Sequence, residues 1–259
     1  MFRIVFHKVF IIHDKLCRQG LFYFNVYGTG TISIIYEDYY KYDKYQKGDL
    51  RMYTGNYECL ELFVKSDEGK KGSVLLKNVK ESTTETKELK HIYGNWIKFP
   101  VSRNTEYEIS TQDCTITFAY LSECENIMEN GICVLDTTDN YKEMNKEEFL
   151  RFIDTPYREQ YHFSPVVNWN NDPNGLCWFK GYYHLFYQLN PFGQEWNNMY
   201  WGHAASKDLM HWTHLPVALE PQEEILDNLA IKGGAFSGSA LPMGDEVILL
   251  ISQDISDLG

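Results

Sequence analysis

Short apolar segments separated by turn-forming residues run along most of the chain, and this pattern constrains its fold most strongly. Four such segments in the first half are CLELFVKS, SVLLKN, NWIKFPV and CTITFAYL, and LFYFNVYGTGTISIIYE adds two strands joined by a Gly-Thr-Gly turn. Short strands at this spacing are typical of a β-sandwich. We therefore predict an all-β chain that begins with a β-sandwich-like accessory module over residues 1–143. The charged stretch KESTTETKELK is predicted to be a loop or an edge strand.

The pattern changes over residues 144–160. Asn145 is suited to cap a helix, and Glu148 follows three residues later, as in a capping box. Aromatic and aliphatic residues then recur at helical spacing until Pro156. We predict a short helical linker here.

Residues 161–259 return to a β pattern that is denser in Trp, His, Asn and Gly. GLCWF and YYHLFYQL flank Lys180-Gly181, which predicts a hairpin. Successive short antiparallel strands fit the four-stranded blades of a β-propeller. The segment has room for one blade and part of a second, so the predicted propeller is incomplete. Because open blades expose apolar sheet faces, we predict that this segment borrows surface from the N-terminal module or from another chain.

Charge and composition exclude several classes of function. The net charge of −12 disfavours binding to nucleic acid and to anionic membranes. None of the six cysteines forms a CxxC pair, so we predict no metal site and interpret the cysteines as buried thiols. No apolar run is long enough for a membrane span or a signal peptide, which predicts a cytoplasmic protein.

The stretch NNDPNG contains the strongest candidate for chemistry, Asp172. Pro173 restricts Asp172 to extended backbone angles, and Asn174-Gly175 is predicted to reverse the chain. The restricted backbone would then hold the carboxylate in a fixed orientation at the end of a strand. Taken alone, the stretch favours a simple turn, because Asp-Pro-Asn-Gly is a good turn sequence, and only its surroundings reverse that interpretation.

Those surroundings carry a resemblance to a known family. HFSPVVNWNNDPNGL, YYHLFYQLNP, MYWGHAASKDLMHWTHLPVAL and GAFSGSAL occur in this order at close spacing. The region from His162 to Ser252 resembles the start of the catalytic domain of glycoside hydrolase family 32, the invertases, fructanases and sucrose-6-phosphate hydrolases. The region before residue 145 carries no resemblance that we can name.

The resemblance implies a five-bladed β-propeller that hydrolyses β-fructofuranosyl bonds of sucrose or fructans with retention of configuration and without a cofactor. Asp172 matches the nucleophile, which forms a covalent fructosyl-enzyme. The matching positions for substrate binding are Asn171, Gln188, Trp196, Phe236 and Ser237. For Trp201, Trp212 and the histidines at 184, 203 and 211, packing or structural hydrogen bonding is the expected role.

The sequence departs from the family pattern in two respects. Asn170 occupies a position before the nucleophile that is apolar in the family. No Arg-Asp-Pro occurs, and Glu-Cys, which in the family contains the acid/base, occurs only at Glu58-Cys59 and Glu123-Cys124, ahead of the nucleophile. We therefore expect an incomplete enzyme that is inactive by itself. The alternative is a non-catalytic glycan-binding or assembly protein that retains part of the propeller.

Overall fold

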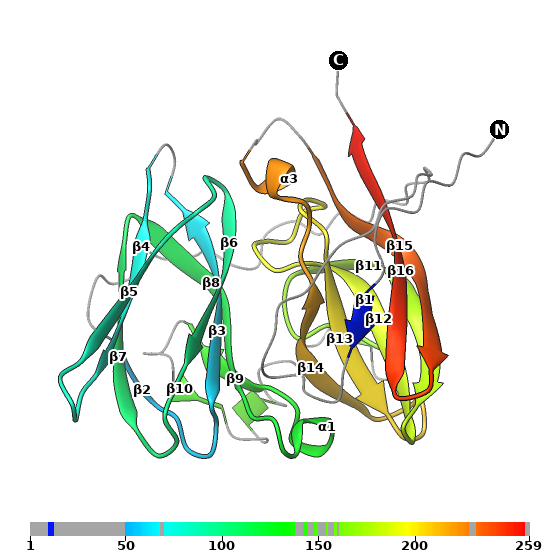
Figure 1. Cartoon of the computed structure of the whole chain (residues 1–259), viewed down its shortest axis with the longest axis horizontal. Helices are drawn as coiled ribbons and strands as arrows, with labels where there is room; N and C mark the ends of the chain where they lie inside the picture. Colours follow the sequence, from blue (N-terminus) through cyan, green and yellow to red (C-terminus); the bar gives the residue numbers. More distant parts are fainter. Residues whose placement is uncertain are drawn as a thin grey trace.

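The computed structural model describes residues 10–12, 50–67, 70–137, 142–144, 148–149, 154, 158–159, 161–227 and 232–256. Strands dominate these residues, and the fold is all-β, as predicted. Four sheets account for the strands, and Figure 1 shows two of them facing each other on the left and the other two on the right. The predicted hairpin in LFYFNVYGTGTISIIYE lies outside the described residues.

The two sheets on the left form a sandwich around one apolar core. One sheet has the order β2-β7-β4-β5 and the other the order β10-β9-β8-β3-β6. Their strands are β2 (Leu50–Tyr53), β3 (Cys59–Ser66), β4 (Ser73–Asn78), β5 (Thr84–Glu88), β6 (Gly94–Pro100), β7 (Glu106–Gln112), β8 (Cys114–Ser122), β9 (Cys133–Asp136) and β10 (Lys142–Glu143). The alternating burial of β4 follows from the two-residue period of a strand. Buried side chains from both sheets, among them Leu62, Leu76 and Ile109, fill the space between them.

The predicted strands of this region are confirmed to within a residue or two. CLELFVKS and SVLLKN coincide with β3 and β4. The charged stretch KESTTETKELK contains β5, which is the edge strand of its sheet. Four of the five residues of β5 are exposed, as suits a sheet edge that has one side open to water.

The third sheet contains four antiparallel strands in chain order, as in a propeller blade. They are β11 (Trp169–Phe179), β12 (Tyr182–Asn190), β13 (Tyr200–Ser206) and β14 (Trp212–Leu219). The predicted hairpin at Lys180-Gly181 joins β11 to β12, and both of its turn residues have positive φ, 46° and 87°. Positive φ at both central residues is the signature of the type I′ turn.

The fourth sheet has the order β1-β16-β15 and lies beside the blade. β15 (Lys232–Met243) and β16 (Glu246–Ser256) form a long hairpin, and β1 (Phe10–Ile12) pairs with the free edge of β16. The segment at residues 10–12 therefore joins this sheet and not the sandwich. The domain boundaries at residues 143 and 161 stay a prediction.

Helices are short in the described residues. α1 (Ile127–Asn130) follows β8, and α3 (Glu223–Asp227) follows β14. Of the predicted helical linker at 144–160, residues 148 and 149 are helical, while the capping position Asn145 and most of the remainder lie outside the described residues. No helix within the described ranges has the length and apolar character needed to cross a membrane.

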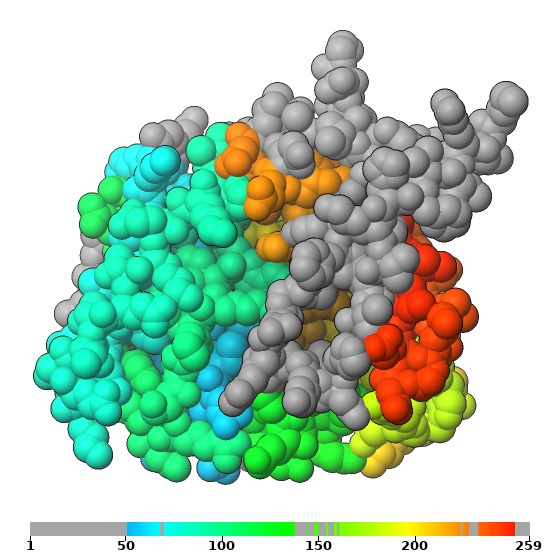
Figure 2. All heavy atoms as spheres, in the orientation of Figure 1, coloured from blue at the N-terminus to red at the C-terminus, as the bar shows by residue number. Residues whose placement is uncertain are grey.

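The sandwich and the blade share an apolar interface. Phe63, Phe118 and Tyr120 of the sandwich pack in one buried cluster with Phe192 and Tyr200 of the blade region. The ring of Phe63 contacts those of Phe192 and Tyr200 edge to face, with centroids 6.1 and 5.7 Å apart. The predicted borrowing of surface from the N-terminal module is thus present in the structure. In Figure 2 the orange segment around α3 lies against the sandwich.

The interpretation of the cysteines as buried thiols is confirmed for Cys114 and Cys133. Cys59 and Cys177 are also outside any disulfide but are only half-buried. Burial raises the pKa of Cys59 and of Cys114 to about 11, so both stay protonated at neutral pH. Cys124, however, is disulfide-bonded. Scattered spacing in a sequence does not reveal which cysteines the fold brings together.

Candidate active site

The NNDPNG stretch lies inside a strand, and the predicted chain reversal at Asn174-Gly175 is wrong. β11 runs without a break from Trp169 to Phe179 and pairs with β12 along its whole length. Two irregularities replace the turn, one between Asn170 and Pro173 and one between Asn174 and Cys177. The turn-forming residues are therefore used to make bulges, which is the other common role of such residues in a strand.

The first bulge determines how Asp172 is presented. Asn170 pairs with Leu189 and Pro173 with Tyr187, so Asn171 and Asp172 together face Gln188. An extra residue of this kind re-aims its neighbours and is common next to active sites. The result is an exposed Asp172 on a strand that is otherwise firmly paired.

Ser237 contacts this carboxylate from the neighbouring sheet. Its Oγ donates a hydrogen bond to Asp172 Oδ2 at 2.5 Å. Ser237 itself lies in a bulge, because Phe236 pairs with Ser252 and Gly238 with Ile251, which leaves Ser237 unpaired in the register. A Cβ on Gly238 would lie 1.9 Å from the Leu250 carbonyl oxygen, so only glycine fits behind this bulge. Two bulges on different sheets thus bring a carboxylate and a hydroxyl together.

Two aromatic side chains lie together beside this pair. Trp196 is 39% exposed, and its ring centroid is 6.1 Å from that of Phe236, the residue before Ser237. The ring planes are tilted by 30°, and the indole stays partly exposed against the residue that precedes Ser237. Apolar ring faces of this kind pack against the faces of sugar rings.

Asn171 and Gln188 are both held by hydrogen bonds. Asn171 Oδ1 accepts from the indole nitrogen of Trp169 at 2.9 Å. Gln188 is 1% exposed, and its Nε2 donates to the Ala235 carbonyl at 2.7 Å. All six residues predicted for the site therefore gather where β11 and β12 meet β15. Their individual roles stay predictions.

A second layer of this site was not predicted from the sequence. Trp201, for which core packing was expected, is fully buried, but its Nε1 donates to the carbonyls of Ala235 (2.9 Å) and Phe236 (3.1 Å). With the Asn174 amide oriented so that its oxygen faces the donors, this oxygen accepts from Gln188 Nε2 at 3.0 Å and from Trp201 Nε1 at 3.2 Å. Gln188 and Trp201 pair directly across β12 and β13, a relation that appears only in the folded chain.

The buried histidines of the blade make structural hydrogen bonds, as expected. His184 Nδ1 lies 3.0 Å from His203 Nε2, and the His203 ring stacks on Phe186 with centroids 4.3 Å apart. Burial lowers the pKa of both histidines, and the neighbouring His184 lowers that of His203 further. Among the described residues, no three His, Cys, Asp or Glu side chains are grouped so that they could hold a metal ion.

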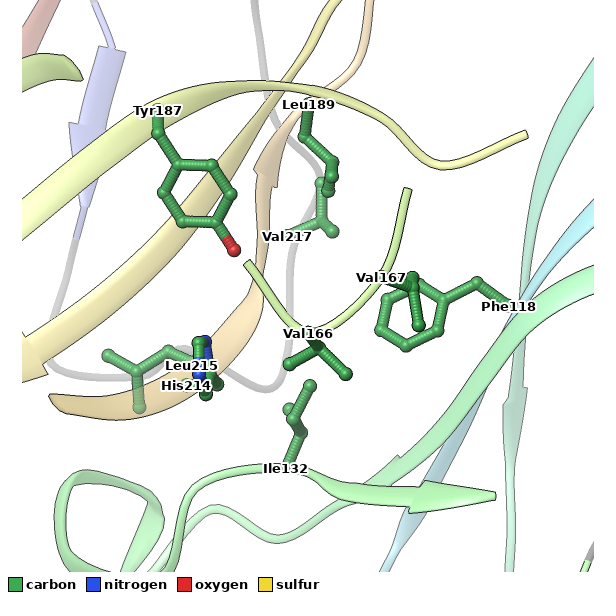
Figure 3. A pocket seen from close by; sticks show the side chains of 9 residues that line it. All are labelled: Phe118, Ile132, Val166, Val167, Tyr187, Leu189, His214, Leu215 and Val217. Carbon is green, nitrogen blue, oxygen red and sulfur yellow. The ribbon is translucent and has the colours of Figure 1, made fainter. Parts of the chain in front are cut away.

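A small apolar pocket lies between the sandwich and the blade (Figure 3). Phe118 and Ile132 line it from the sandwich side, while Tyr187 and Leu189 line it from β12. Because neighbouring residues of a strand point to opposite faces, Tyr187 and Leu189 lie on the face opposite to Gln188. The pocket is therefore behind the candidate site and not part of it.

Both Glu-Cys sequences lie in the sandwich. Glu58 precedes β3 and forms an ion pair with Arg103 at 3.0 Å. Glu123 follows β8, is buried, and accepts a hydrogen bond from Asn130. Each carboxylate thus has a structural partner within its own module.

Comparison with known proteins gives a class for the second half of the chain. The sequence pattern of the family described as "Glycosyl hydrolases family 32 N-terminal domain" matches residues 162–257. A levanase of Bacillus subtilis is 56% identical over 90 residues, which are 35% of this chain and 12% of the levanase. An extracellular exo-inulinase of Aspergillus awamori is 65% identical over 66 residues, 26% of this chain and 12% of that protein.

One solved structure covers both modules. The structure of a glycoside hydrolase family 32 protein from Bifidobacterium adolescentis matches with a TM-score of 0.68 and 35% identity, over 76% of this chain and 31% of that one. Residues 145–259 are too few to make up 76% of the chain, so the match extends into the region before residue 145. The sandwich therefore has a structural relative, although its sequence alone suggested none.

These matches relate the second half of the chain to the glycoside hydrolases. Residues 162–257 carry the sequence pattern of the N-terminal domain of glycoside hydrolase family 32. The chain spans about an eighth of the length of the levanase and exo-inulinase, at 12% of each.

Proposed function

We propose that Asp172 is the nucleophile of a retaining β-fructosidase site that acts on sucrose or fructans. The observation that carries the proposal is the exposed Asp172 carboxylate, which accepts a hydrogen bond from Ser237 where two bulges meet. The Trp196 ring packs on Phe236, the residue before Ser237. A nucleophile has to be accessible and held in a constant orientation, and both conditions are met here. Similarity to a levanase and an exo-inulinase supports fructosyl units as the substrate class.

The reaction follows from these positions. A carboxylate oxygen of Asp172 attacks the anomeric carbon of the fructosyl unit, the bond to the leaving oxygen breaks, and a fructosyl ester forms on Asp172. Ser237 Oγ donates to Oδ2, which leaves the other oxygen available for the attack. Water then cleaves the ester and releases fructose. Two displacements at one carbon give net retention.

The leaving group determines what the chain can do by itself. Retaining hydrolysis of a sugar leaving group needs a second carboxyl group about 5–5.5 Å from the nucleophile, acting first as acid and then as base. We assign this role neither to Glu58 nor to Glu123, because both are held within the sandwich. We therefore propose that residues 1–259 alone hydrolyse little or no sucrose, inulin or levan.

An activated substrate tests the nucleophile without requiring an acid. Fluoride leaves β-D-fructofuranosyl fluoride with the electron pair of its bond to carbon and does not require a proton. We expect the full chain to release one fluoride per protein and to retain one fructosyl group on the peptide that contains Asp172, detected by mass spectrometry. The ester should accumulate because no assigned base activates water.

Asp172→Asn should abolish both the fluoride burst and the labelled peptide. Asp245→Asn is a matched control, because that side chain is 93% exposed and lies at the tip of the β15–β16 hairpin. Labelling of a different residue, or equal labelling of Asp172→Asn, would refute the assignment. Rapid turnover of sucrose by the wild-type chain would refute the proposal that it lacks an acid/base.

The alternative, a glycan-binding or assembly protein without catalysis, predicts a different result. Such a protein would bind inulin or levan in a calorimetric titration with the same affinity in wild type and in Asp172→Asn, and it would show no fructosyl adduct.

A further inference from the structure

The segment before Ser237 connects two sheets at the candidate site. Asp172 belongs to the blade sheet through β11, whereas Ser237 belongs to the β1-β16-β15 sheet. The contact between their side chains therefore depends on whatever fixes the start of β15 against the blade. Backbone hydrogen bonds do this at Met199, whose N–H donates to Gly233 at 3.0 Å and whose carbonyl accepts from Ala235 at 2.8 Å. Beyond Ala235, side chains continue the connection.

Trp201 makes the central side-chain contact. Its indole N–H points between two successive carbonyls, those of Ala235 at 2.9 Å and Phe236 at 3.1 Å. The side chain is completely buried, so these hydrogen bonds do not compete with water. The two carbonyls are the last backbone acceptors before the bulged Ser237.

Gln188 and Asn174 complete the connection. Gln188 Nε2 donates to the same Ala235 carbonyl at 2.7 Å. With its amide turned as described above, the Asn174 oxygen accepts from both donors. Asn174 is two residues after Asp172 in the same strand. The buried polar side chains of Trp201, Gln188 and Asn174 thus connect β11, which carries Asp172, with β15, which carries Ser237.

We propose that Trp201 is a positioning residue for the fructosyl transfer, because its indole N–H fixes the carbonyls of Ala235 and Phe236 and thereby sets where Ser237 meets Asp172. The inference rests on the proposed function of Asp172. Trp201 is buried beneath the site, so it acts on the reaction through the position of Ser237 and not by contact with the substrate. Gln188 supports the same carbonyl from the adjacent strand.

Trp201→Phe removes the N–H donor and keeps an aromatic ring. Because the smaller ring also leaves space in the core, a second variant should carry 3-benzothienylalanine at position 201, in which sulfur replaces the N–H in a ring system of similar shape. Trp212→Phe is the matched control, since Trp212 lies on β14 and packs against Phe163 on the side of the sandwich.

The decisive measurement is a double-mutant cycle of labelling by β-D-fructofuranosyl fluoride. Loss of one orienting hydrogen bond should lower the limiting labelling rate of both position-201 variants about tenfold, with the half-saturating concentration unchanged. In a Ser237→Ala background, the same changes should lower the rate less than about twofold, because the group that Trp201 positions is absent. Trp212→Phe should label at the wild-type rate.

If the labelling rate falls by the same factor with Ser237 present and in the Ser237→Ala background, Trp201 has only a general structural role. Wild-type labelling rates in both position-201 variants would exclude any role. If the wild type itself is not labelled, the proposed function fails separately, and positioning is judged by hydrogen–deuterium exchange. Faster exchange over residues 235–238 in both position-201 variants but not in Trp212→Phe supports the positioning, whereas unchanged exchange overturns it.

Discussion

The hydroxyl of Tyr120, in the sandwich, accepts a hydrogen bond from the backbone N–H of Val217, in the blade, at 3.1 Å. The same hydroxyl donates to the buried carboxylate of Glu61 at 3.0 Å. Glu61 Oε2 also accepts from Trp96 Nε1 at 2.7 Å and lies 3.4 Å from Lys98 Nζ. A single oxygen thus joins the two modules in the middle of their apolar interface.

Tyr120→Phe should therefore destabilise both modules together. The change removes one partner from each of two buried groups, which typically costs about 1–3 kcal/mol. We expect a lower urea midpoint by that amount, with tryptophan fluorescence and far-ultraviolet circular dichroism shifting in parallel. Tyr161→Phe, at a residue that is 65% exposed, is the control and should stay within about 0.5 kcal/mol of wild type. A wild-type midpoint for Tyr120→Phe would show that the bridge contributes nothing.

The fit of Phe192 against Gly94 gives a steric prediction for the same interface. A Cβ on Gly94 would lie 2.4–2.6 Å from atoms of the Phe192 ring. Gly94→Ala should therefore force the ring out of the buried cluster and destabilise the chain by about 1–3 kcal/mol in urea unfolding. Gly193→Ala is the matched control beside the same ring, because nothing lies within 4 Å of its added methyl group. Phe192→Leu should partly rescue Gly94→Ala, and equal midpoints for the two alanine variants would contradict the steric account.

Buried histidines predict a loss of stability in mild acid. Burial lowers the pKa of His184 and His203, and burial together with the charge of Arg158 lowers that of His214 to about 4. Below about pH 6.5 the unfolded chain binds protons on these residues that the folded chain does not bind. Their contribution is thus fully present above pH 6.5 and is lost as the pH falls from there toward 4.

Urea midpoints measured from pH 7.5 to 4.5 should therefore decline, and His214→Phe should flatten the decline. His162→Gln is the control, because its side chain is 61% exposed. If His214→Phe and wild type lose stability in parallel, His214 does not contribute to the pH dependence.

The sequence was sufficient to predict where strands lie in the chain, but it did not predict the bulges within them. Alternation and turn residues located β3 and β4 to the residue, because a two-residue period is a local property. NNDPNG, in contrast, was expected to reverse the chain, since its residues favour turns and bulges alike. Only pairing with β12 along the whole strand makes it a pair of bulges, and that pairing is not local.

The same limit applies to the site. Family resemblance pointed to residues that the structure brings into contact, Ser237 with Asp172 and Trp196 with Phe236. Trp201 remained an ordinary core residue because its partners are backbone carbonyls 34 and 35 residues away, which no side-chain pattern reveals. The sandwich–blade interface was expected only in general terms, since the contacts of Phe63 with Phe192 and Tyr200 depend on the folded shape of both modules.

The bulge at Ser237 gives the most direct test of the site geometry. In Gly238→Ala the new methyl group would collide with the Leu250 carbonyl, so the backbone of β15 has to move and carry Ser237 away from Asp172. Since a misplacement of about 1 Å can cost about a hundredfold in rate, labelling by β-D-fructofuranosyl fluoride should fall by about that factor. Ser239→Ala, at the exposed position next to it, should label at the wild-type rate. Circular dichroism separates this loss from unfolding. Wild-type labelling of a folded Gly238→Ala would mean that the position of Ser237 set by this bulge does not affect the reaction at Asp172.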